Sequence, residues 1–413
     1  KFIVLNIEYN NLKNIKNFNY ILINDPDEIN DFDIFKNENI GIEIENHNDI
    51  WYNILNIKLF SIINFNNIIN NEWSFFDNIK IDNISSNFLK FISKKKKKII
   101  ITGITGQDGS ILGEYLINTN DKDMIVIGTV RSISVLKHEN IIKIINNKYF
   151  CPILLDLSDK DKTEYIFKYI KPDYFFNCAA QVTVYNTTPY NIENTFFINT
   201  ISPLRHLEYI NKYCKNCKYL SCGSSEEFGN IKYTPQDLNH PCNPINIYGI
   251  TKNTTHNIVK YFRENLNIFC CHVVLYNHES TRRSINFVTR KITNEIAKIK
   301  IDMTNNIIPK PLKIGNINSK RDWSCAEDFI KAFWKILNHD VPNDYILSSG
   351  ETHTIKEMID IAFNYVGLPL TWNLNNNIFD TKAYHNDILM IEISKDYYRD
   401  NDDLRYFKGD NSE

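Results

Sequence analysis

The stretch IIITGITGQDGSILGEYLINT, residues 99–119, decides the fold class. It opens with a short apolar run, which is typical of a buried strand in a parallel sheet. Gly103, Gly106 and Gly109 follow, and then a segment with the composition of a helix. Glycines are needed where a backbone turns tightly and approaches a pyrophosphate, with the helix N-terminus facing the negative charge. The stretch therefore predicts the opening strand, turn and helix of a dinucleotide-binding fold.

Five more apolar runs follow, and segments with helical composition separate them. The runs are MIVIGTV (124–130), PILLDL (152–157), YFFNCAA (174–180), KYLSCGS (218–224) and IFCCHVVLY (268–276). Repeated alternation of strand and helix is the signature of a doubly wound parallel sheet. We therefore predict an α/β fold of the Rossmann type.

The composition of the chain argues against several classes of function. Its 413 residues, 43% of them apolar, are enough for one large domain or two ordinary ones. The net charge of -2 and the pI of about 6.6 provide no basic field for nucleic acid. No uninterrupted apolar run reaches the roughly 18 residues that a membrane span requires.

The cysteines indicate a reduced, cytoplasmic protein. There are nine of them, an odd number, scattered from Cys151 to Cys325, which favours free thiols over a disulfide framework. Cys214 and Cys217 form one CxxC pair, but a four-ligand zinc site needs a second pair with that spacing. No metal is therefore predicted.

The first 96 residues form a low-complexity extension rich in Asn, Ile and Lys. Residues 1–93 hold 22 Asn and 21 Ile but a single Gly, and a run of five lysines follows. The apolar content is too high for a plain disordered tail, so the fold and role of this extension stay open. Because the chain begins with Lys1 rather than Met, we expect that an upstream segment is missing.

The glycine turn, with Gln107 and Asp108, is the predicted cofactor-binding loop, and Arg131 indicates which dinucleotide it takes. An NAD site usually carries an acid just past the second strand, where it binds the ribose 2′-hydroxyl. Here that position is Arg131, whose guanidinium is suited to a 2′-phosphate. The sequence therefore favours NADP as the cofactor, with an ordinary surface arginine as the alternative interpretation.

The motif YGITK, residues 248–252, predicts a catalytic base. On a helix, positions i and i+4 share a face, so Lys252 is expected beside Tyr248. A lysine ammonium near a tyrosine hydroxyl favours the phenolate and lowers the pKa of the phenol. Such a base can take a proton from a sugar hydroxyl while a hydride leaves the carbon. An ordinary helix pair is the alternative, and the glycine turn upstream favours catalysis.

The stretch SCGSSEEFG, residues 221–229, places carboxylates at the end of a predicted buried strand. In an open parallel sheet, ligands bind beyond the carboxyl ends of the strands. Ser224, Ser225 and Glu226 are therefore candidate active-site residues, with a solvated turn as the alternative. Glu227 is expected to turn the other way, into a structural or solvent-facing position, and His256 to be an ordinary structural histidine.

These segments together resemble the extended short-chain dehydrogenases/reductases, and within them the GDP-mannose 4,6-dehydratase family. That family carries Thr-Ser-Glu at the strand end, where this chain has Ser224, Ser225 and Glu226. Sugar-nucleotide 4-epimerases lack the acid, and nucleotide-glucose 4,6-dehydratases carry Thr-Asp-Glu. The resemblance covers roughly residues 97–410.

Further motifs, in the family's order, carry the same resemblance. They are LYNHESTRRSINFVTRKI (275–292), GNINSKRDWSCAEDF (315–329) and YYRDNDDLRYFKGD (397–410). The resemblance implies that the cofactor contacts Asp156, Leu157, Ala179, Ala180, Gln181, Lys252, His278 and Arg283. It implies that the substrate contacts Asn277, Arg321 and Arg399.

The resemblance implies conversion of GDP-mannose to GDP-4-keto-6-deoxymannose, the first step toward GDP-fucose, with bound NADP. The implied steps are oxidation at C4 with Tyr248 as base, loss of water across C5 and C6 with Glu226 and Ser224, and reduction at C6. Because Glu226 must act first as base and then as acid, a buried carboxyl is expected. An NADP-binding domain at 97–270 and a smaller C-terminal α/β region at 271–413, mainly for substrate, are implied, as is a homo-oligomer, a dimer or tetramer.

Several positions depart from the family pattern. The Ser-His expected after the Ala-Gln of the cofactor loop is Val182-Thr183, and the second residue of an expected Arg-Arg pair is Ser132. The chain stops soon after FKGD, which we interpret as a C-terminal truncation. The alternatives left open are a dehydratase or epimerase acting on another nucleotide sugar, and a truncated non-catalytic descendant that binds a nucleotide.

Overall fold

The computed structural model describes residues 92–119, 121–132, 138–182, 189–398 and 406–412, together with three short strands nearer the N-terminus. Those strands, β1 (Phe2–Leu5), β2 (Tyr20–Ile23) and β3 (Gly41–Ile44), form a parallel sheet in the order β2-β1-β3. The Asn- and Ile-rich extension therefore contains a small sheet, and the rest of the extension before residue 92 lies outside the described residues.

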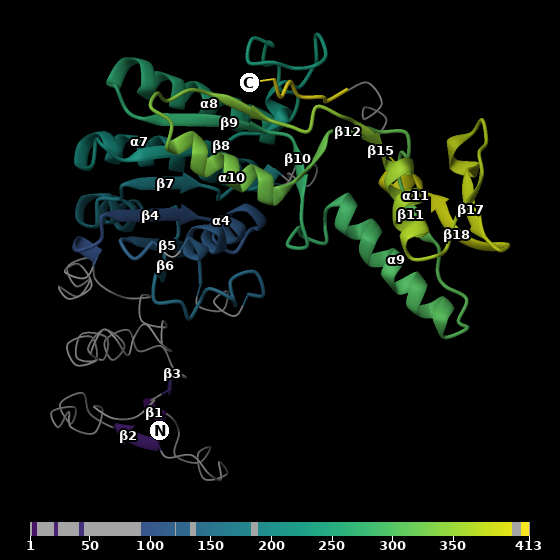
Figure 1. Cartoon of the computed structure of the whole chain (residues 1–413), viewed down its shortest axis with the longest axis horizontal. Coiled ribbons are helices and arrows are strands. Elements are labelled where there is room, and N and C mark those ends of the chain that lie inside the picture. Colours follow the sequence, from purple (N-terminus) through teal and green to yellow (C-terminus); the bar gives the residue numbers. More distant parts are fainter. Residues whose placement is uncertain are drawn as a thin grey trace. The chain divides into compact units, whose positions relative to one another are not determined.

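Seven strands form one sheet in the order β14-β9-β8-β7-β4-β5-β6 (Figure 1). From β4 the chain adds strands outward on one side, crosses back, and adds the remaining strands on the other side, which is the doubly wound pattern. The pairs β4–β5, β5–β6, β8–β9 and β9–β14 are parallel. The predicted Rossmann-type fold is thus confirmed.

Six of the seven strands of this sheet follow the predicted apolar runs. These six are β4 (Lys97–Thr102), β5 (Met124–Val130), β6 (Phe150–Leu154), β7 (Tyr174–Asn177), β8 (Lys218–Cys222) and β9 (Cys270–Leu275). The seventh strand, β14 (Tyr345–Leu347), was not predicted. Every residue of β5 and of β9 is buried. Continuous apolar runs of this kind belong to strands that are covered on both faces.

The chain divides into two compact units, which we describe one at a time. The first comprises residues 1–105, 112–176 and 208–217, and the second comprises residues 106–111, 177–207 and 218–413. The first unit contains α5 (Lys160–Tyr165) and the π-helical turn η6 (Ile166–Ile170), where the rings of Phe167 and Phe175 stack 5.1 Å apart. The domain boundaries that we placed at 96/97 and 270/271 stay predictions.

In the second unit, helices cover the strands that carry the candidate site. Helix α8 (Ile247–Leu266) packs against β9, and α10 (Ala326–Leu337) packs against β8 (Figure 1). Helix α8 also contacts η7 (Phe197–Ile201), which joins α6 (Pro189–Phe196) to α7 (Ser202–Tyr213), and the 3-10 turn η8 (Ser225–Glu227). The helix expected around YGITK is confirmed.

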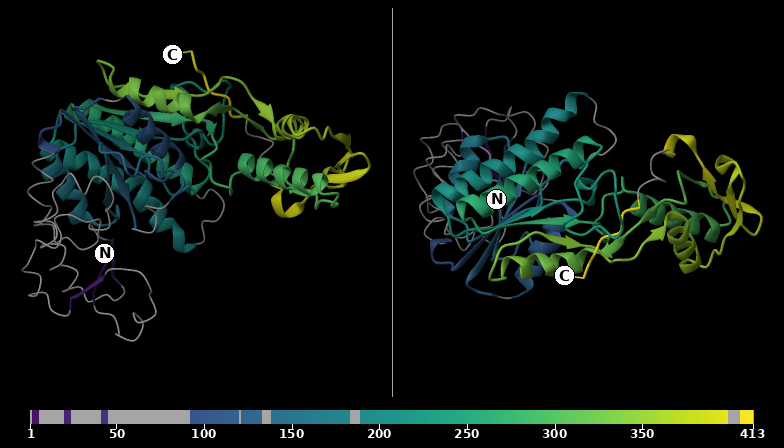
Figure 2. Two further views of the ribbon diagram at one scale, coloured as in Figure 1. Left: turned by 60° about the horizontal axis from the view of Figure 1, so that its bottom comes forward. Right: turned by 90° about the horizontal axis from the view of Figure 1, so that it is seen from above.

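The C-terminal part of the second unit has a smaller core of its own. A four-stranded sheet in the order β11-β18-β17-β16 is accompanied by α9 and α11 (Figures 1 and 2). Ile296, Ile359, Phe363 and Ile391 lie in its core. The elements are α9 (Val288–Thr304), β11 (Leu312–Ile314), α11 (Ile355–Tyr365), β16 (Thr371–Asn373), η9 (Ile378–Asp380), β17 (Lys382–His385), β18 (Ile388–Ile393) and η10 (Lys395–Tyr397).

Two short strand pairs complete the second unit. Strand β10 (Asn277–Glu279) pairs in parallel with β13 (Trp323–Cys325), and β12 (Lys320–Arg321) pairs antiparallel with β15 (His353–Thr354). Among the helices of the described ranges, none combines the length and the apolar character needed to cross a bilayer.

Candidate active site

The glycine turn lies where the sequence predicts it, between β4 and α4 (Gln107–Asn118). Gly103 has a φ of 68°, in the left-handed region that residues with a side chain disfavour. The first amide groups of α4 follow directly, and a helix N-terminus favours negative charge. The turn is therefore a backbone cradle of the kind that fits a pyrophosphate, although its role in this chain stays a prediction.

Side chains in the first turn of α4 are tied to the segment that follows β9. Gln107 Nε2 donates to the His278 carbonyl at 3.0 Å, and the Ser280 hydroxyl donates to Gln107 Oε1 at 2.8 Å. His278 Nε2 lies 2.9 Å from Asp108 Oδ1, and His278 Nδ1 lies 2.8 Å from the Tyr276 carbonyl. The structure thus brings the glycine turn into contact with the motif at 275–292.

Asp108 and His278 form a partly buried ion pair. Burial by itself raises the pKa of Asp108, but the charge and the hydrogen bond of His278 outweigh it and lower the pKa to about 2. Burial by itself lowers the pKa of His278, and Asp108 in turn outweighs it, so that this pKa is raised. The acid in the first turn of α4 is therefore neutralised by a partner, and its charge opposes an incoming phosphate less.

The loop after β7, which includes Ala179, Ala180 and Gln181, is held by one asparagine. Asn199 Oδ1 accepts from the Gln181 amide at 2.8 Å, and Asn199 Nδ2 donates to the Gln181 carbonyl at 3.1 Å. The same Nδ2 also lies 3.1 Å from Thr251 Oγ1 on α8. The predicted cofactor loop is therefore fixed to the helix that carries the predicted base.

Tyr248 and Lys252 lie together in the first turns of α8, as the motif predicts. Asn246 caps the helix, with Oδ1 accepting from the Gly249 amide at 2.7 Å. Both Tyr248 and Lys252 are buried. Lys252 Nζ donates to the Cys222 carbonyl at 2.6 Å and lies 5.7 Å from the centre of the Tyr248 ring. The carbonyl at the end of β8 thus orients the ammonium group beside the phenol.

The pKa of Tyr248 differs from the sequence expectation. We expected Lys252 to lower it, but burial raises the pKa of the phenol, and this effect is the largest. The charge of Lys252, a hydrogen bond from Ser224 and the charge of Arg283 act in the expected direction without reversing it. A phenol withdrawn from water loses solvation of its anionic form, which the sequence pattern does not reveal.

Ser224 and Glu226 stand at the end of β8, in and beside η8. The Ser224 hydroxyl accepts from the Glu226 amide at 3.3 Å, and Glu226 Oε2 accepts from Asn246 Nδ2 at 2.7 Å. Glu226 is half-buried, whereas we expected a buried carboxyl. The buried position in this turn belongs to its neighbour Glu227, whose side chain points into the protein. Glu226 therefore remains accessible to a substrate.

The turn that holds these residues is closely packed at Gly229. This glycine has a φ of 55°, and a Cβ added there would clash with the backbone carbonyl of Asn243. Gly367 also has a positive φ, of 74°, but no atom lies within 4 Å of the position that its Cβ would take. A side chain at Gly229 would therefore cause both backbone strain and a steric clash, whereas a side chain at Gly367 would cause backbone strain alone.

The change Gly229→Ala is expected to lower the free energy of unfolding by about 3 kcal/mol, from left-handed strain together with overpacking. Gly367→Ala, which adds strain alone, should cost about 1 kcal/mol. Urea denaturation of both variants measures the difference. Equal losses in the two variants would contradict a close contact between the turn and the Asn243 backbone.

The first unit contains further residues predicted to contact the dinucleotide, of which Arg131 is the one predicted to select it. Arg131 directly follows β5 and is exposed. Asp156 is also exposed, and its pKa is lowered first by the hydrogen bond from the Ser158 amide at 2.8 Å and also by the charge of Arg131. Leu157 beside it is buried. Arg131 and Asp156 are therefore electrostatic neighbours, and their roles stay predictions.

The predicted substrate residues are distributed over the second unit. Asn277 lies in β10, paired with Trp323, and Arg321 lies in β12, where its Nη1 donates to the Lys320 carbonyl at 2.8 Å. Arg399 lies outside the described residues. The substrate contacts of these residues stay predictions.

Arg283, which we assigned to the cofactor, lies close to the catalytic candidates. Its guanidinium stacks 3.8 Å from the centre of the Phe287 ring, and its Nε lies 3.5 Å from Glu279. Its charge acts on the pKa of both Tyr248 and Asp108. The positive charge of Arg283 therefore faces the same region as the predicted base and the glycine turn.

Sequence reasoning missed Asn246, which contacts the start of α8 with its carbonyl oxygen and Glu226 with its amide nitrogen. A signal was present, because asparagine is one of the preferred N-cap residues and stands two positions before Tyr248. The bond to Glu226 had no comparable signal, since it joins residues 20 positions apart.

Comparison with solved structures shows which class of fold this chain has. The UDP-glucose 4-epimerase of Thermotoga maritima, with UDP-glucose, has a TM-score of 0.61 and 19% identity, covering 76% of this chain and 89% of that one. The dTDP-glucose 4,6-dehydratase of Bacillus anthracis, in complex with NAD, has a TM-score of 0.56 and 16% identity, covering 66% and 81%. This chain therefore has the fold of the nucleotide-sugar epimerases and dehydratases.

Sequence comparison narrows this class to one family. Residues 100–413 match the family described as GDP-mannose 4,6 dehydratase. GDP-mannose 4,6 dehydratase of Drosophila melanogaster is 33% identical over 323 residues, covering 74% of this chain and 77% of that protein. GDP-mannose 4,6-dehydratase of Vibrio cholerae is 33% identical over 286 residues, covering 67% and 74%. The chain belongs to the GDP-mannose 4,6-dehydratase family.

Proposed function

We propose that this chain converts GDP-mannose to GDP-4-keto-6-deoxymannose by removing one molecule of water. Its family membership and the names of its relatives support the proposal. The observation that carries it is the grouping of Tyr248 and Lys252 on α8 with Ser224 and Glu226 at the end of β8. A binding protein has no need of a tyrosine base and a separate acid at one site.

Tyr248 takes the proton of the C4 hydroxyl. For this step Tyr248 must be a phenolate, which Lys252 stabilises and to which the Ser224 hydroxyl donates a hydrogen bond. Burial raises the pKa of Tyr248, so Lys252 and Ser224 have to stabilise the phenolate where little water is present to solvate it. Fixed dipoles and charges are more effective there than in bulk water.

Glu226 acts at C5 and C6 of the same sugar. A ketone at C4 acidifies the C5 proton, and the Glu226 carboxylate accepts that proton. The same carboxyl then gives this proton to the C6 hydroxyl, which departs as water. When C6 is later reduced, C5 takes up one proton, which balances the proton that Tyr248 took from the C4 hydroxyl. The hydrogen bond from Asn246 Nδ2 fixes one oxygen of this carboxylate, and half-burial leaves the group accessible to both carbons in turn.

The residues present fit a nicotinamide dinucleotide, since left-handed Gly103 and the start of α4 form a cradle for a pyrophosphate. When bound, this cofactor accepts a hydride from C4 and supplies one to C6. Gln107, Asp108 and Lys252 would border it in the second unit. The further residues proposed to contact it are Gly106, Gly109, Ala179, Ala180, Gln181, His278 and Arg283 in that unit, and Asp156 and Leu157 in the first.

We infer NADP rather than NAD as that cofactor, because Arg131 stands where an NAD site carries an acid. The change Arg131→Ala is expected to weaken NADP binding by about 10- to 100-fold, the typical value of a hydrogen-bonded charge contact, and to leave NAD binding within about threefold. Titration calorimetry with both dinucleotides measures the difference. An equal loss for the two would assign Arg131 a general role and leave NADP selection to other residues.

Further proposals concern substrate and assembly. Asn277, Arg321 and Arg399 are proposed to bind GDP-mannose, with the two arginines at the diphosphate.

We propose that the chain forms a homo-oligomer, a dimer or tetramer, which light scattering after size-exclusion chromatography tests. We also propose the domain division at 96/97 and 270/271, which limited proteolysis tests.

The decisive experiment incubates the purified full chain with GDP-mannose and catalytic NADP and follows the nucleotide sugars by mass spectrometry. A product lighter by one water, without net formation of NADPH, is expected. An isomer of unchanged mass would instead indicate an epimerase. Binding of both ligands without any product would indicate a non-catalytic protein, and failure to bind GDP-mannose would overturn the substrate assignment.

A further inference from the structure

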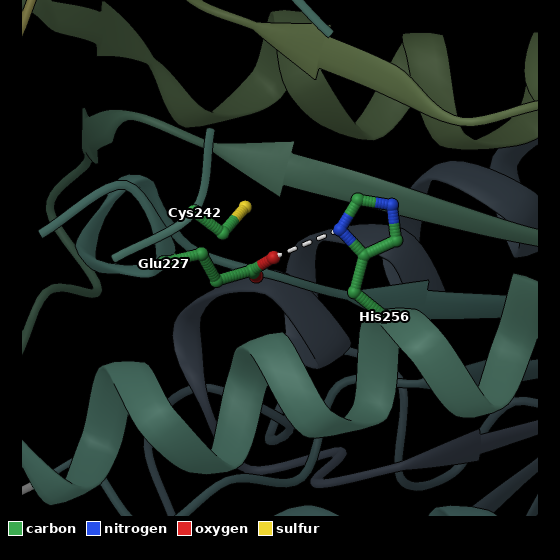
Figure 3. A group of neighbouring side chains, drawn as sticks. All are labelled: Glu227, Cys242 and His256. Carbon is green, nitrogen blue, oxygen red and sulfur yellow. Dashed lines mark hydrogen bonds and ion pairs between the residues drawn. The ribbon is translucent and has the colours of Figure 1, made fainter. Parts of the chain in front are cut away.

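Glu227, the neighbour of the proposed acid–base Glu226, is completely buried and accepts hydrogen bonds from three directions. Its Oε1 accepts from the Ser224 amide at 2.8 Å and lies 3.0 Å from His272 Nε2 on β9. Its Oε2 lies 3.2 Å from His256 Nδ1 on α8 (Figure 3). One carboxylate thus joins η8 to both a helix and a strand.

His256 is an imidazolium in this arrangement. Its Nδ1 faces Glu227 and its Nε2 lies 3.2 Å from Asp344 Oδ2, so each ring nitrogen has to donate a proton to a carboxylate. Burial by itself lowers the pKa of His256, and its partners Asp344, Cys242 and Glu227 outweigh this and raise the pKa to about 11. The histidine therefore stays charged throughout the physiological range.

The outer end of the network is anchored by Arg263. Its two terminal nitrogens bind the two oxygens of Asp344 at 2.7 and 2.6 Å, and the His272 amide donates to Asp344 at 3.1 Å. Burial by itself lowers the pKa of His272, whose ring stacks on that of His256 with centres 4.4 Å apart. Two carboxylates thus face two cations, and the buried charge is balanced.

The turn is packed against this network without spare room. A Cβ added to Gly223 would lie 2.6 Å from Glu227 Oε1, and a Cβ on Gly249 would clash with the Glu226 carbonyl. Helix α8 carries Tyr248, Lys252 and His256 at successive intervals of four residues, so they share one face. The helix that presents the base is therefore the helix that holds Glu227.

We propose that Glu227 and His256 are positioning residues for the dehydratase reaction: His256 fixes the Glu227 carboxylate, and Glu227 fixes the Ser224 amide, so that η8 presents Ser224 and Glu226 to the Tyr248 side of the site. This inference rests on the proposed function. The buried ion network of Glu227 and His256 would hold Ser224 and Glu226 in place, so that they can reach different carbons of one sugar.

A metal site is the competing interpretation of the same residues. Glu227, Cys242 and His256 each offer a ligand atom, and these atoms lie within 4.8 Å of one another (Figure 3). A metal requires a deprotonated ring nitrogen, however, and both nitrogens of His256 are engaged as donors to carboxylates. The geometry therefore favours a protonated His256 ring nitrogen over one that binds a metal.

The test compares Glu227→Gln, His256→Gln and the double variant with wild type, using His206→Gln as a control, since His206 is also buried but bonds to Ser202 outside the network. Each single change is expected to lower kcat by about 10- to 100-fold with KM for GDP-mannose within about threefold. The double variant leaves no unpaired charge, because Asp344 keeps Arg263, so its thermal stability should return while kcat stays low.

Two readouts do not depend on turnover. Hydrogen exchange of the segment 223–229 is expected to accelerate at least about tenfold in His256→Gln and to stay unchanged in His206→Gln. In Glu227→Gln, His256 loses one of two carboxylates, so its pKa should fall from about 11, as NMR titration of its ring measures. In wild type the ring should not titrate between about pH 6 and about pH 9.

The outcomes separate this inference from the proposed function. An inactive wild type with slow exchange in 223–229 that His256→Gln accelerates would overturn the function and leave the positioning network supported. An active wild type whose Glu227→Gln variant keeps kcat would overturn the network's role. If the double variant regained activity together with stability, the positioning role would also be overturned. Tight binding of added Zn²⁺ that is lost in Cys242→Ser would overturn it as well.

Discussion

Replacing Tyr248 with phenylalanine is expected to lower kcat by about 10³-fold, within the range that a positioned proton-transfer group contributes. The change removes one oxygen atom and leaves the ring that packs in the first turns of α8, so the thermal stability should change little. Mass spectrometry of the nucleotide sugars under saturating GDP-mannose measures the rate. The loss should appear in kcat, because the hydroxyl does its work after binding.

The pH dependence provides an independent test of Tyr248. Burial raises the pKa of the phenol, and the protonated form cannot act as a base, so kcat/KM should fall as the pH falls. Tyr248→Phe should remove this limb from the residual activity. Tyr261→Phe is the matched control, because Tyr261 is an exposed tyrosine on the same helix. A Tyr248→Phe variant within about tenfold of wild type would sink the assignment of the base.

Replacing Glu226 with glutamine is expected to lower kcat by about 10³-fold or more, since one group loses both its basic and its acidic role. The glutamine carbonyl can still accept the bond from Asn246 Nδ2, so the turn should keep its conformation. Titration with NADP should give an unchanged affinity, which separates lost chemistry from lost structure.

Glu264→Gln provides the control for this change, because Glu264 is an exposed acid on α8 that forms a long ion pair with Lys260 at 4.0 Å. It should keep full activity. If Glu226→Gln retained activity while Tyr248→Phe did not, the proton at C5 would have to be removed by another group. The adjacent acid in the sequence, Glu227, is buried and engaged with two histidines.

Six of the seven strands of the sheet were predictable because they are short apolar runs, whose burial needs no knowledge of partners. The edge strand β14 was missed because it has only three residues, all of them half-buried. β5 and β9 are buried at every position, and the runs found by reading the sequence match them closely. The pairing of Tyr248 with Lys252 was predictable for a related reason. It depends on the pitch of one helix and on nothing farther away along the chain.

What could not be predicted depends on contacts between distant residues. The bond from Asn246 to Glu226 spans 20 positions, that from His256 to Glu227 spans 29, and that from His256 to Asp344 spans 88. We expected His256 to be an ordinary structural histidine and left open whether Glu227 faced solvent. The raised pKa of Tyr248 was missed likewise, because the extent of burial depends on the packed structure.

Asn246 caps α8, and Tyr248, Lys252 and His256 follow on the helix at intervals of four residues. An α-helix turns by about 100° per residue, so inserting or deleting one residue within this stretch would rotate everything after it away from its partners. Point substitutions can alter these groups one at a time, whereas a change of length would disturb several at once. The start of α8 should therefore tolerate exchange of its outward-facing residues far better than any shift of register.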